Sequence, residues 1–387
     1  METIVFCSTK SKDWSLEKNS GKTRLLFIMM NLQCGGAERV IVSYLNNLPR
    51  SRYEISLFVM RLEGPFVAEI PEDIPVTSGL KHGQRLSCHL LSVIKKIFRC
   101  SSAVDIIIGG LEFDTVYLSA LTKMILKKRT FGWNHTDMVS YMKRIPKRHK
   151  FLTWLFYPLI DTLIFVSEDA RERALKELPH LNKNKTTVLF NPIDIDKINT
   201  LSNTTYESNK IQSRPYIVSV GRLDYYKGFD LLIDAFDNIK DDMSADLIII
   251  GEGKSRKSLV ERVLRKGLQD RIRFTGFMHN PFPIIRNAQL YVSASRHEGF
   301  GLTIVEAMAL GVPVVATNCR SGPSEILDNG RFGLLVPPDN VDRLSKAILF
   351  MLNDPAKRKS FGKSAASRAN DFGVSTIMRQ FDSLVLH

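Results

Sequence analysis

A repeated succession of buried strand, glycine turn and amphipathic helix constrains the fold of this chain more than any other feature. Residues 24–31 (RLLFIMMN) form a nearly continuous apolar run, which Gly35-Gly36 and an amphipathic segment at 37–48 follow. The succession restarts at 216–220 (YIVSV) and its helix at 229–239. Buried strands that alternate with helices indicate a parallel, doubly wound α/β sheet. We expect further strands at 53–60, 104–108, 129–133, 162–166, 186–190, 246–250, 272–275, 290–293, 312–317 and 333–336.

The length of the chain indicates two domains. A chain of 387 residues is long for one hydrophobic core. The polar stretch 197–214 is typical of a connection, and Asn191-Pro192 is the expected hinge. We expect an N-terminal extension at 1–22, one Rossmann-like domain at 23–190, a second at 191–373, and a final helix at 374–387 that packs back on the first domain.

Composition excludes several classes of protein. No run approaches the roughly 20 apolar residues of a membrane helix, and the N-terminus is too polar for a secretory signal, so we expect a cytoplasmic protein. The cysteines are odd in number, and their spacing favours neither a disulfide framework nor a zinc site. They are Cys7, Cys34, Cys88, Cys100 and Cys319.

The positive charge favours an anionic partner. The net charge is +14, and residues 81–150 carry fourteen Lys and Arg against four Asp and Glu. Two segments within 81–160, LLSVIKKIFRC and YMKRIPKRHKFLTWLFYPLI, mix basic with apolar and aromatic side chains, which is typical of segments on an anionic membrane surface. Nucleic acid is the rival partner, but the chain has no RNA-binding aromatic signature and no zinc-finger spacing, so we expect none. A basic face that only meets solvent is the third interpretation.

Four glycine-containing loops follow expected strands, where ligands of such sheets bind. Gly35 and Gly36 open a helix and suit a phosphate. After strand 216–220, Gly221 is followed by Arg222 and Lys227, whose charges can clamp a diphosphate. The loop 251–253 lacks the last glycine of a dinucleotide fingerprint, so NAD is not indicated.

The fourth loop carries two carboxylates seven residues apart. Glu298 lies in a loop with Gly299 and Gly301, and Glu306 lies in the helix that follows, so both can reach one hydroxyl-rich ligand at a helix N-terminus. The alternative is a capping box, in which Thr303 caps the helix and Glu306 only closes its free N–H groups.

Two further polar positions remain. His135 follows strand 129–133 and is a candidate for orienting a substrate, although a purely structural role fits it equally well. The pair Asp194 and Asp196 has the spacing of a metal-binding motif, but its place near the hinge favours a turn or helix cap, so no metal is expected.

The order of these motifs resembles family 4 glycosyltransferases of the GT-B fold. The matching features are GGAER after the first strand, the His135 loop, Asn191-Pro192, Gly221-Arg222 with Lys227-Gly228, and Glu-x7-Glu. The resemblance covers residues 24–387. It implies two Rossmann-like doubly wound domains that face each other across a cleft, with the acceptor on the first domain and the nucleotide sugar on the second.

The resemblance also implies roles for individual residues. Arg222 and Lys227 would hold the donor diphosphate, Glu306 the ribose, and Glu298 the donor sugar. Arg222, Lys227, Glu298 and His135 are the expected catalytic residues. The remaining donor-binding residues are Gly35, Gly36, Gly221, Phe277, Met278, Gly299, Phe300, Gly301 and Leu302.

The implied reaction is sugar transfer with retention of anomeric configuration, without metal or other cofactor. The departing phosphate would take the acceptor's proton, and a covalent carboxylate intermediate remains an alternative. We expect a UDP-sugar donor, with SGPSEI at 321–326 similar to enzymes that use UDP-N-acetylhexosamines. The expected acceptor is a lipid-linked glycan of capsule, O-antigen or other bacterial surface polysaccharide, reached at the inner face of the membrane. A UDP-sugar epimerase and a non-catalytic binding module are the alternatives.

Overall fold

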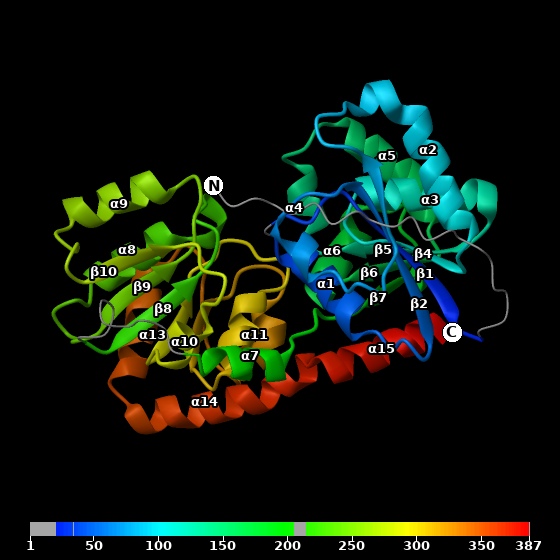
Figure 1. Cartoon of the computed structure of the whole chain (residues 1–387). Coiled ribbons are helices and arrows are strands. Elements are labelled where there is room, and N and C mark those ends of the chain that lie inside the picture. The colour runs from blue at the N-terminus through cyan, green and yellow to red at the C-terminus, as the bar shows by residue number, and fades with distance from the viewer. Residues whose placement is uncertain (1–20, 34, 205–213, 387) are drawn as a thin grey trace, which may run out of the picture. The chain divides into compact units, whose positions relative to one another are not determined.

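A computed structural model describes residues 21–33, 35–204 and 214–386 of the chain (Figure 1). The first twenty residues of the expected extension, Cys7 and Cys34 lie outside this part. Contacts divide the chain into two compact units. The first unit comprises Met1–Trp133 and Phe151–Thr162, and the second comprises Asn134–Lys150 and Leu163–His387. The domain boundaries expected at 190 and 373, and the packing of the final helix on the first domain, stay predictions.

Two parallel sheets confirm the α/β expectation. The seven-stranded sheet has the order β3-β2-β1-β4-β5-β6-β7, and the six-stranded sheet has the order β10-β9-β8-β11-β12-β13. The strands are β1 (Thr23–Met29), β2 (Tyr53–Arg61), β3 (Val76–Leu80), β4 (Ile106–Gly109), β5 (Arg129–Asn134), β6 (Thr162–Phe165), β7 (Thr186–Val188), β8 (Tyr216–Val220), β9 (Asp246–Ile250), β10 (Ile272–Gly276), β11 (Leu290–Ser293), β12 (Val314–Thr317) and β13 (Leu334–Val336).

Helices connect these strands, as crossovers between parallel strands require. The α-helices are α1 (Gly36–Asn47), α2 (Leu86–Ser102), α3 (Asp114–Leu126), α4 (Met138–Met142), α5 (Arg148–Phe156), α6 (Glu168–Glu177), α7 (Ile195–Ser202), α8 (Phe229–Asp237), α9 (Arg256–Arg265), α10 (Phe282–Arg286), α11 (Leu302–Ala309), α12 (Pro323–Ile326), α13 (Val341–Leu352), α14 (Pro355–Ala369) and α15 (Val374–Leu386). Short 3₁₀ helices are η1 (Pro65–Glu69), η2 (Tyr157–Leu159), η3 (Lys183–Lys185), η5 (Tyr225–Lys227), η6 (Asp328–Gly330) and η7 (Asn370–Phe372).

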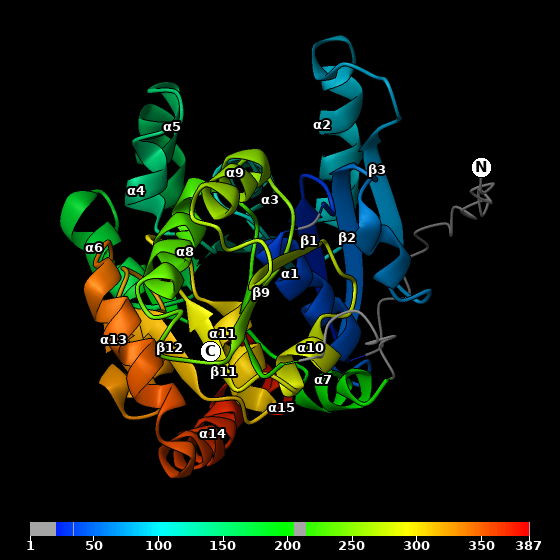
Figure 2. The same ribbon diagram turned by 90° about the vertical axis from the view of Figure 1, so that its left-hand side faces the viewer.

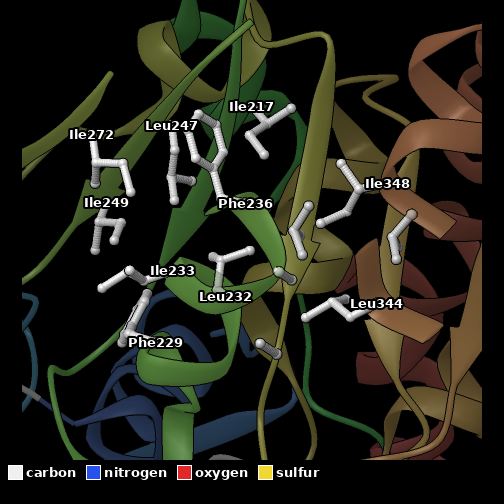
Figure 3. Packing of buried hydrophobic residues seen from close by; sticks show 14 of the residues in the cluster. Ile217, Phe229, Leu232, Ile233, Phe236, Leu247, Ile249, Ile272, Leu344 and Ile348 are labelled. Carbon is white, nitrogen blue, oxygen red and sulfur yellow. The ribbon is translucent and has the colours of Figure 1, made fainter. Parts of the chain in front are cut away.

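In the second unit, α8 and α13 cover one face of the six-stranded sheet. Figure 3 shows Phe229, Leu232 and Phe236 of α8 packed against strand side chains such as Leu247 and Ile249. All five side chains are at most 2% exposed. Full burial of each such side chain contributes about 1.5–3 kcal/mol to the stability of the folded chain. The core therefore holds the ends of β8 and β11 in fixed positions.

In the first unit, α2 packs one face on the strands and exposes the other. Val93 and Ile97 are buried against a cluster that includes Phe58 and Leu80, and Figure 2 shows α2 beside β3. The strand β3 (VTSGL) was missed by the sequence prediction because polar and small residues interrupt its apolar pattern.

The stretch 197–214, which we expect to be the connection, begins within a helix. This helix, α7, covers Ile195–Ser202. Asp194 begins this helix, because its carboxylate accepts a hydrogen bond from the Lys197 N–H at 2.9 Å. The helix-cap interpretation of Asp194 is therefore confirmed, and the hinge at Asn191-Pro192 stays a prediction. Residues 205–213 lie outside the described part.

Candidate functional site

The order of the six-stranded sheet places two of the expected loops side by side. Connections run in opposite directions from β8 and β11, which pair directly in parallel. Such a reversal of strand order is the usual ligand site of a doubly wound sheet, outside the carboxyl ends of the strands. The loop after β8 carries Arg222 and Lys227, and the loop after β11 carries Glu298.

Gly228 allows these two loops to touch. Its φ is +63°, and a Cβ atom there would stand 2.0 Å from the Ala294 carbonyl oxygen. No real side chain tolerates that distance, and a non-glycine residue would also be strained at this φ. The close backbone approach brings Lys227, the residue before this glycine, towards the loop after β11.

Lys227 and Glu298 form an ion pair across the two loops. The Lys227 ammonium donates to both carboxylate oxygens of Glu298, at 2.7 and 2.8 Å, and the Ser295 hydroxyl donates to Oε1 at 2.6 Å. The Glu298 side chain is 7% exposed and that of Lys227 is 25% exposed. The two residues that the sequence assigned to one site are therefore joined, 71 positions apart along the chain.

Asp224 fixes the conformation of the loop at 221–228, called the basic loop because it carries Arg222 and Lys227. The sequence prediction missed this role. Its Oδ1 accepts from the N–H groups of Tyr226 and Lys227, at 3.0 and 3.2 Å, and so caps η5. Its Oδ2 accepts from Arg222 Nε at 2.7 Å. The Arg222 side chain is 73% exposed, which leaves most of its N–H donors facing solvent. An Asp two positions after a basic residue is the signal that could have found it.

The structure contradicts the capping-box interpretation. Gly301, at φ +109°, is the N-cap of α11, so Thr303 lies inside the helix. The Thr303 hydroxyl instead accepts a 2.7 Å hydrogen bond from the Tyr291 hydroxyl. Glu306 is 2% exposed in this helix. Glu306 lies beyond the third helical position, where the acid of a capping box would stand.

Tyr291 was also missed and lies close enough to Glu298 and Glu306 for their charges to act on it. Burial raises the pKa of its hydroxyl, and the negative charges of Glu298 and Glu306 raise it further, against the effect of the Thr303 hydrogen bond. The hydroxyl is therefore a neutral donor near both acidic side chains. A tyrosine on a buried strand gives no sequence signal of this role.

His135 lies beside the loop of Glu298. A Cβ on Gly299 would stand 2.0 Å from the His135 carbonyl oxygen, so the two backbones are in direct contact. Phe300 packs in turn against Phe190 and Phe372, with ring centroids 5.8 and 5.6 Å away. His135 and Gly299 both belong to the second unit.

The stretch 321–326 supports the same loop from another side. Gly322 has φ +111°, and a Cβ there would stand 1.7 Å from the Phe300 carbonyl oxygen. The Glu325 carboxylate accepts from the N–H groups of Glu168 and Asp169, at 2.8 and 3.0 Å, at the start of α6. Burial raises the pKa of Glu325, and the charges of these two acidic residues raise it further, although the two N–H groups oppose the shift.

The loop 251–253 packs closely against the loop after β8. Gly251 has φ +141°, and a Cβ there would lie 2.0 Å from the Gly221 carbonyl oxygen; at Gly253 the distance to the Leu223 oxygen would be 2.4 Å. These glycines allow the β9 loop to pack under the basic loop. At the adjacent β10 end, Gly276 has φ +80° and Phe277 is half exposed, while Met278 follows it.

Gly35 and Gly36 lie in the first unit, at the start of α1. Gly35 is the N-cap with an ordinary extended backbone, and a Cβ there would collide with the Glu38 carboxylate. The other expected site residues, from His135 to Glu306, lie in the second unit. Within the described residues, no group of three or more His, Cys, Asp or Glu side chains could hold a metal ion.

The basic segments of the first unit expose apolar side chains. On α2 these are Leu86, Leu90 and Leu91, the last 83% exposed. Phe151 and Trp154 of α5 are also exposed and stack with ring centroids 6.1 Å apart. Among the described helices, none is both long and apolar enough to span a bilayer.

Comparisons with protein families identify both halves of the chain. Residues 34–197 match the model "Glycosyltransferase Family 4", and residues 203–368 match "Glycosyl transferases group 1". Together the two models account for most of the chain.

Two relatives from Campylobacter jejuni align over nearly their whole length. The chain is 29% identical to N-acetylgalactosamine-N,N'-diacetylbacillosaminyl-diphospho-undecaprenol 4-alpha-N-acetylgalactosaminyltransferase, over 92% of this chain and 97% of the relative. It is 25% identical to GalNAc-alpha-(1->4)-GalNAc-alpha-(1->3)-diNAcBac-PP-undecaprenol alpha-1,4-N-acetyl-D-galactosaminyltransferase, over 94% and 98%.

Among solved structures, HepE of Anabaena in complex with UDP has the same fold. The TM-score is 0.79 at 22% identity, and the match covers 94% of this chain and 99% of HepE. A second structure of HepE, with UDP-glucose, gives a TM-score of 0.77.

Proposed function

This chain belongs to glycosyltransferase family 4 and has the GT-B fold, and we propose that it transfers a sugar from a UDP-sugar to a lipid-linked glycan with retention of anomeric configuration. The observation that carries the proposal is the Lys227–Glu298 pair, which joins the loops of β8 and β11 where the sheet order reverses. A fixed cation beside a buried carboxylate suits a ligand that carries both phosphate and sugar hydroxyls.

The donor is arranged along these loops in our proposal. The guanidinium of Arg222 and the ammonium of Lys227 hold the diphosphate. Glu306 binds the ribose hydroxyls, and Glu298 with the amides of Phe300, Gly301 and Leu302 binds the sugar. The base lies against Phe277 and Met278. The remaining residues of the proposed donor site are Gly35, Gly36, Gly221 and His135. Supporting this arrangement, Arg222 is largely exposed and Glu298 is already fixed by Lys227 and Ser295.

In the proposed reaction the acceptor hydroxyl attacks the anomeric carbon on the face from which the diphosphate leaves. The carbon–phosphate oxygen bond breaks, and the departing phosphate oxygen takes the proton of the acceptor. Arg222 and Lys227 stabilise the growing negative charge. A covalent glycosyl intermediate on Glu298 is less favoured, because both of its oxygens accept hydrogen bonds.

We also propose that transfer needs no metal ion, because two cationic side chains lie in the basic loop that would hold the diphosphate. Transfer measured with and without EDTA tests this point. An unchanged rate supports it, and a loss that Mg²⁺ or Mn²⁺ restores contradicts it.

The relatives favour an acceptor on an undecaprenyl diphosphate and an N-acetylhexosamine donor. Both Campylobacter enzymes are named for transfer of N-acetylgalactosamine to such lipids. A relative from Erwinia amylovora, 21% identical, is named for amylovoran biosynthesis. We therefore place this enzyme in the synthesis of a bacterial surface polysaccharide such as a capsule or O-antigen.

A panel of UDP-, GDP- and ADP-sugars tests the donor. A ligand that binds only the folded state at 100 times its Kd stabilises it by about 2.7 kcal/mol, which raises the melting temperature measurably. We expect UDP-N-acetylhexosamines to give the largest shift, and a larger shift with GDP- or ADP-sugars would contradict the proposal. Incubation with UDP-N-acetylglucosamine alone tests the alternative, since only an epimerase converts that sugar without an acceptor.

A lipid acceptor requires the enzyme to reach the membrane surface, and we propose that α2, α3 and α5 make this contact. Leu90 and Leu91 of α2, Ile125 of α3 and Trp154 of α5 are exposed among basic residues. Apolar insertion and attraction to anionic headgroups act together in such segments.

Flotation with liposomes tests the membrane contact. Wild type should float with anionic vesicles more than with neutral ones, and moderate salt should weaken the binding. Leu91→Glu should reduce flotation, while the matched control Leu264→Glu, at an exposed leucine of α9 in the other unit, should not. Equal flotation with neutral and anionic lipid would contradict the proposal.

A further inference from the structure

The segment Asn134–Lys150 touches both loops of the proposed donor site. At its start, the His135 carbonyl oxygen meets the backbone of Gly299. Further along, the guanidinium carbon of Arg144 lies 3.8 Å from the centre of the Tyr226 ring. Tyr226 immediately precedes Lys227, and its carbonyl oxygen accepts the Arg296 N–H at 2.7 Å. Arg144 therefore stands beside the basic loop at a fixed position.

Most cations around these loops are neutralised by carboxylates. The pairs are Arg222–Asp224, Lys227–Glu298, Arg296 with Asp230 and Asp339, and Arg173–Asp137. Arg144 and Arg320 differ, because neither has a carboxylate partner within the described residues. Both are exposed, so their N–H donors face solvent.

His297 links these two unpaired arginines. Its ring centre is 5.9 Å from that of Tyr226, and its backbone forms a bridge with Arg320. Burial lowers the pKa of the imidazole, and the positive charge of Arg144 lowers it further, as do those of Arg173 and Arg320 against the effect of Asp137. The imidazole is therefore neutral near pH 7, so the positive charges available to an anion here are those of Arg144 and Arg320.

We propose that Arg144, which lies over the ring of Tyr226, binds a phosphate oxyanion of a substrate, with Arg320 as the second cation. A guanidinium stacked on an aromatic ring keeps its N–H edge free and oriented, which suits bidentate binding of phosphate. Two substrates of the proposed function carry this group, the nucleotide sugar and the lipid diphosphate. The inference rests on that proposed function, and two sets of measurements separate the sources.

The first measurement is calorimetric binding of UDP and uridine to wild type, Arg144→Ala and Arg144→Lys. If the donor diphosphate is the ligand, Arg144→Ala should weaken UDP binding about tenfold, which corresponds to about 1.4 kcal/mol, because a charged hydrogen bond to phosphate is lost, and it should leave uridine binding unchanged. Arg144→Lys should recover only part of the loss, since an ammonium cannot bind bidentately.

The second measurement is transfer from a saturating UDP-N-acetylhexosamine to two acceptors that carry the same sugar. One is a short polyprenyl diphosphate glycoside, and the other is the octyl glycoside without phosphate. If the acceptor phosphate is the ligand, Arg144→Ala should lower kcat/KM about tenfold for the diphosphate acceptor and leave the octyl glycoside unaffected.

Controls separate a binding role from a structural one. Lys143→Ala removes the same charge from the neighbouring exposed position and should change each value less than twofold. Tyr226→Leu should reproduce the effect of Arg144→Ala, whereas Tyr226→Phe keeps the ring and should not. Equal losses for Arg144→Ala with both acceptors and unchanged UDP binding would overturn the inference. No transfer by wild type to either acceptor would instead refute the proposed function.

Discussion

Breaking the Lys227–Glu298 pair gives the sharpest test of the site geometry. At a mean distance of about 2.8 Å and an effective dielectric constant of about 20, two unit charges attract by roughly 6 kcal/mol before desolvation is subtracted. The carboxylate is 7% exposed and the ammonium is 25% exposed, so water screens one side of the pair. We expect a net coupling of about 2 kcal/mol, within the range for close charge pairs.

The single substitutions should have unequal effects on the free energy of unfolding. Lys227→Met leaves the buried Glu298 carboxylate with the Ser295 hydroxyl as its remaining hydrogen-bond donor among the described residues, and should lower the free energy of unfolding by about 3 kcal/mol. Glu298→Gln keeps a hydrogen-bond acceptor for both donors and should cost about 1–2 kcal/mol. The double variant should cost about 2 kcal/mol less than the sum of the two.

Urea unfolding followed by circular dichroism measures each value. Lys257→Met, at an exposed lysine of α9 with no ion pair in the described residues, is the matched control and should change stability by less than about 0.5 kcal/mol. If the effects of Lys227→Met and Glu298→Gln add to within about 0.5 kcal/mol, the two side chains are not coupled and the reasoning fails.

Three other outcomes follow from the same contacts. Arg222→Ala and Glu306→Gln should each lower transfer at least about a hundredfold with unchanged circular dichroism, and near-normal turnover in both would contradict their assignment to the donor. Gly299→Ala should lower both melting temperature and transfer, because its Cβ would stand 2.0 Å from the His135 oxygen; wild-type values would show that this contact is absent. The raised pKa of Glu325 means that its carboxyl binds a proton more tightly in the folded than in the unfolded chain. Its contribution to stability is therefore full below the unfolded value near 4.5 and is lost as pH rises through the folded pKa. Urea midpoints should fall less for Glu325→Gln than for wild type over that interval, and parallel pH curves would refute this.

Much of the fold was predictable because buried strands in parallel sheets are continuous apolar runs. The strands β8, β9 and β11 have the predicted limits, and each is built mainly from buried side chains. The strand β3 and the helix α7 were missed, because VTSGL and IDKINTLS carry short, mixed patterns that depend on neighbouring elements for their burial.

The residue types of the candidate site were also predictable, since glycine, arginine and glutamate lie in the loops that follow the predicted strands. Their partners were not. Asp224 has a local signal in its position after Arg222, but nothing in the local sequence indicates that Tyr291 lies near Glu298 and Glu306, or that Thr303 accepts from Tyr291 instead of capping α11. The contacts of Tyr291 depend on how β11 packs against α11, which no local pattern specifies.

The sequence by itself determined the two parallel sheets, the glycine loops and the charged residues that these loops carry, because strand burial and backbone freedom are local properties. Only the tertiary structure decided that Lys227 pairs with Glu298 and that Arg144 stacks on Tyr226. For the ion pair, the physical reason is the reversed order of β8 and β11, which brings together loops that are about seventy residues apart. Arg144 reaches Tyr226 from the segment Asn134–Lys150 of the same unit. Which charges become neutralised, and which remain available to a substrate, follows from that arrangement.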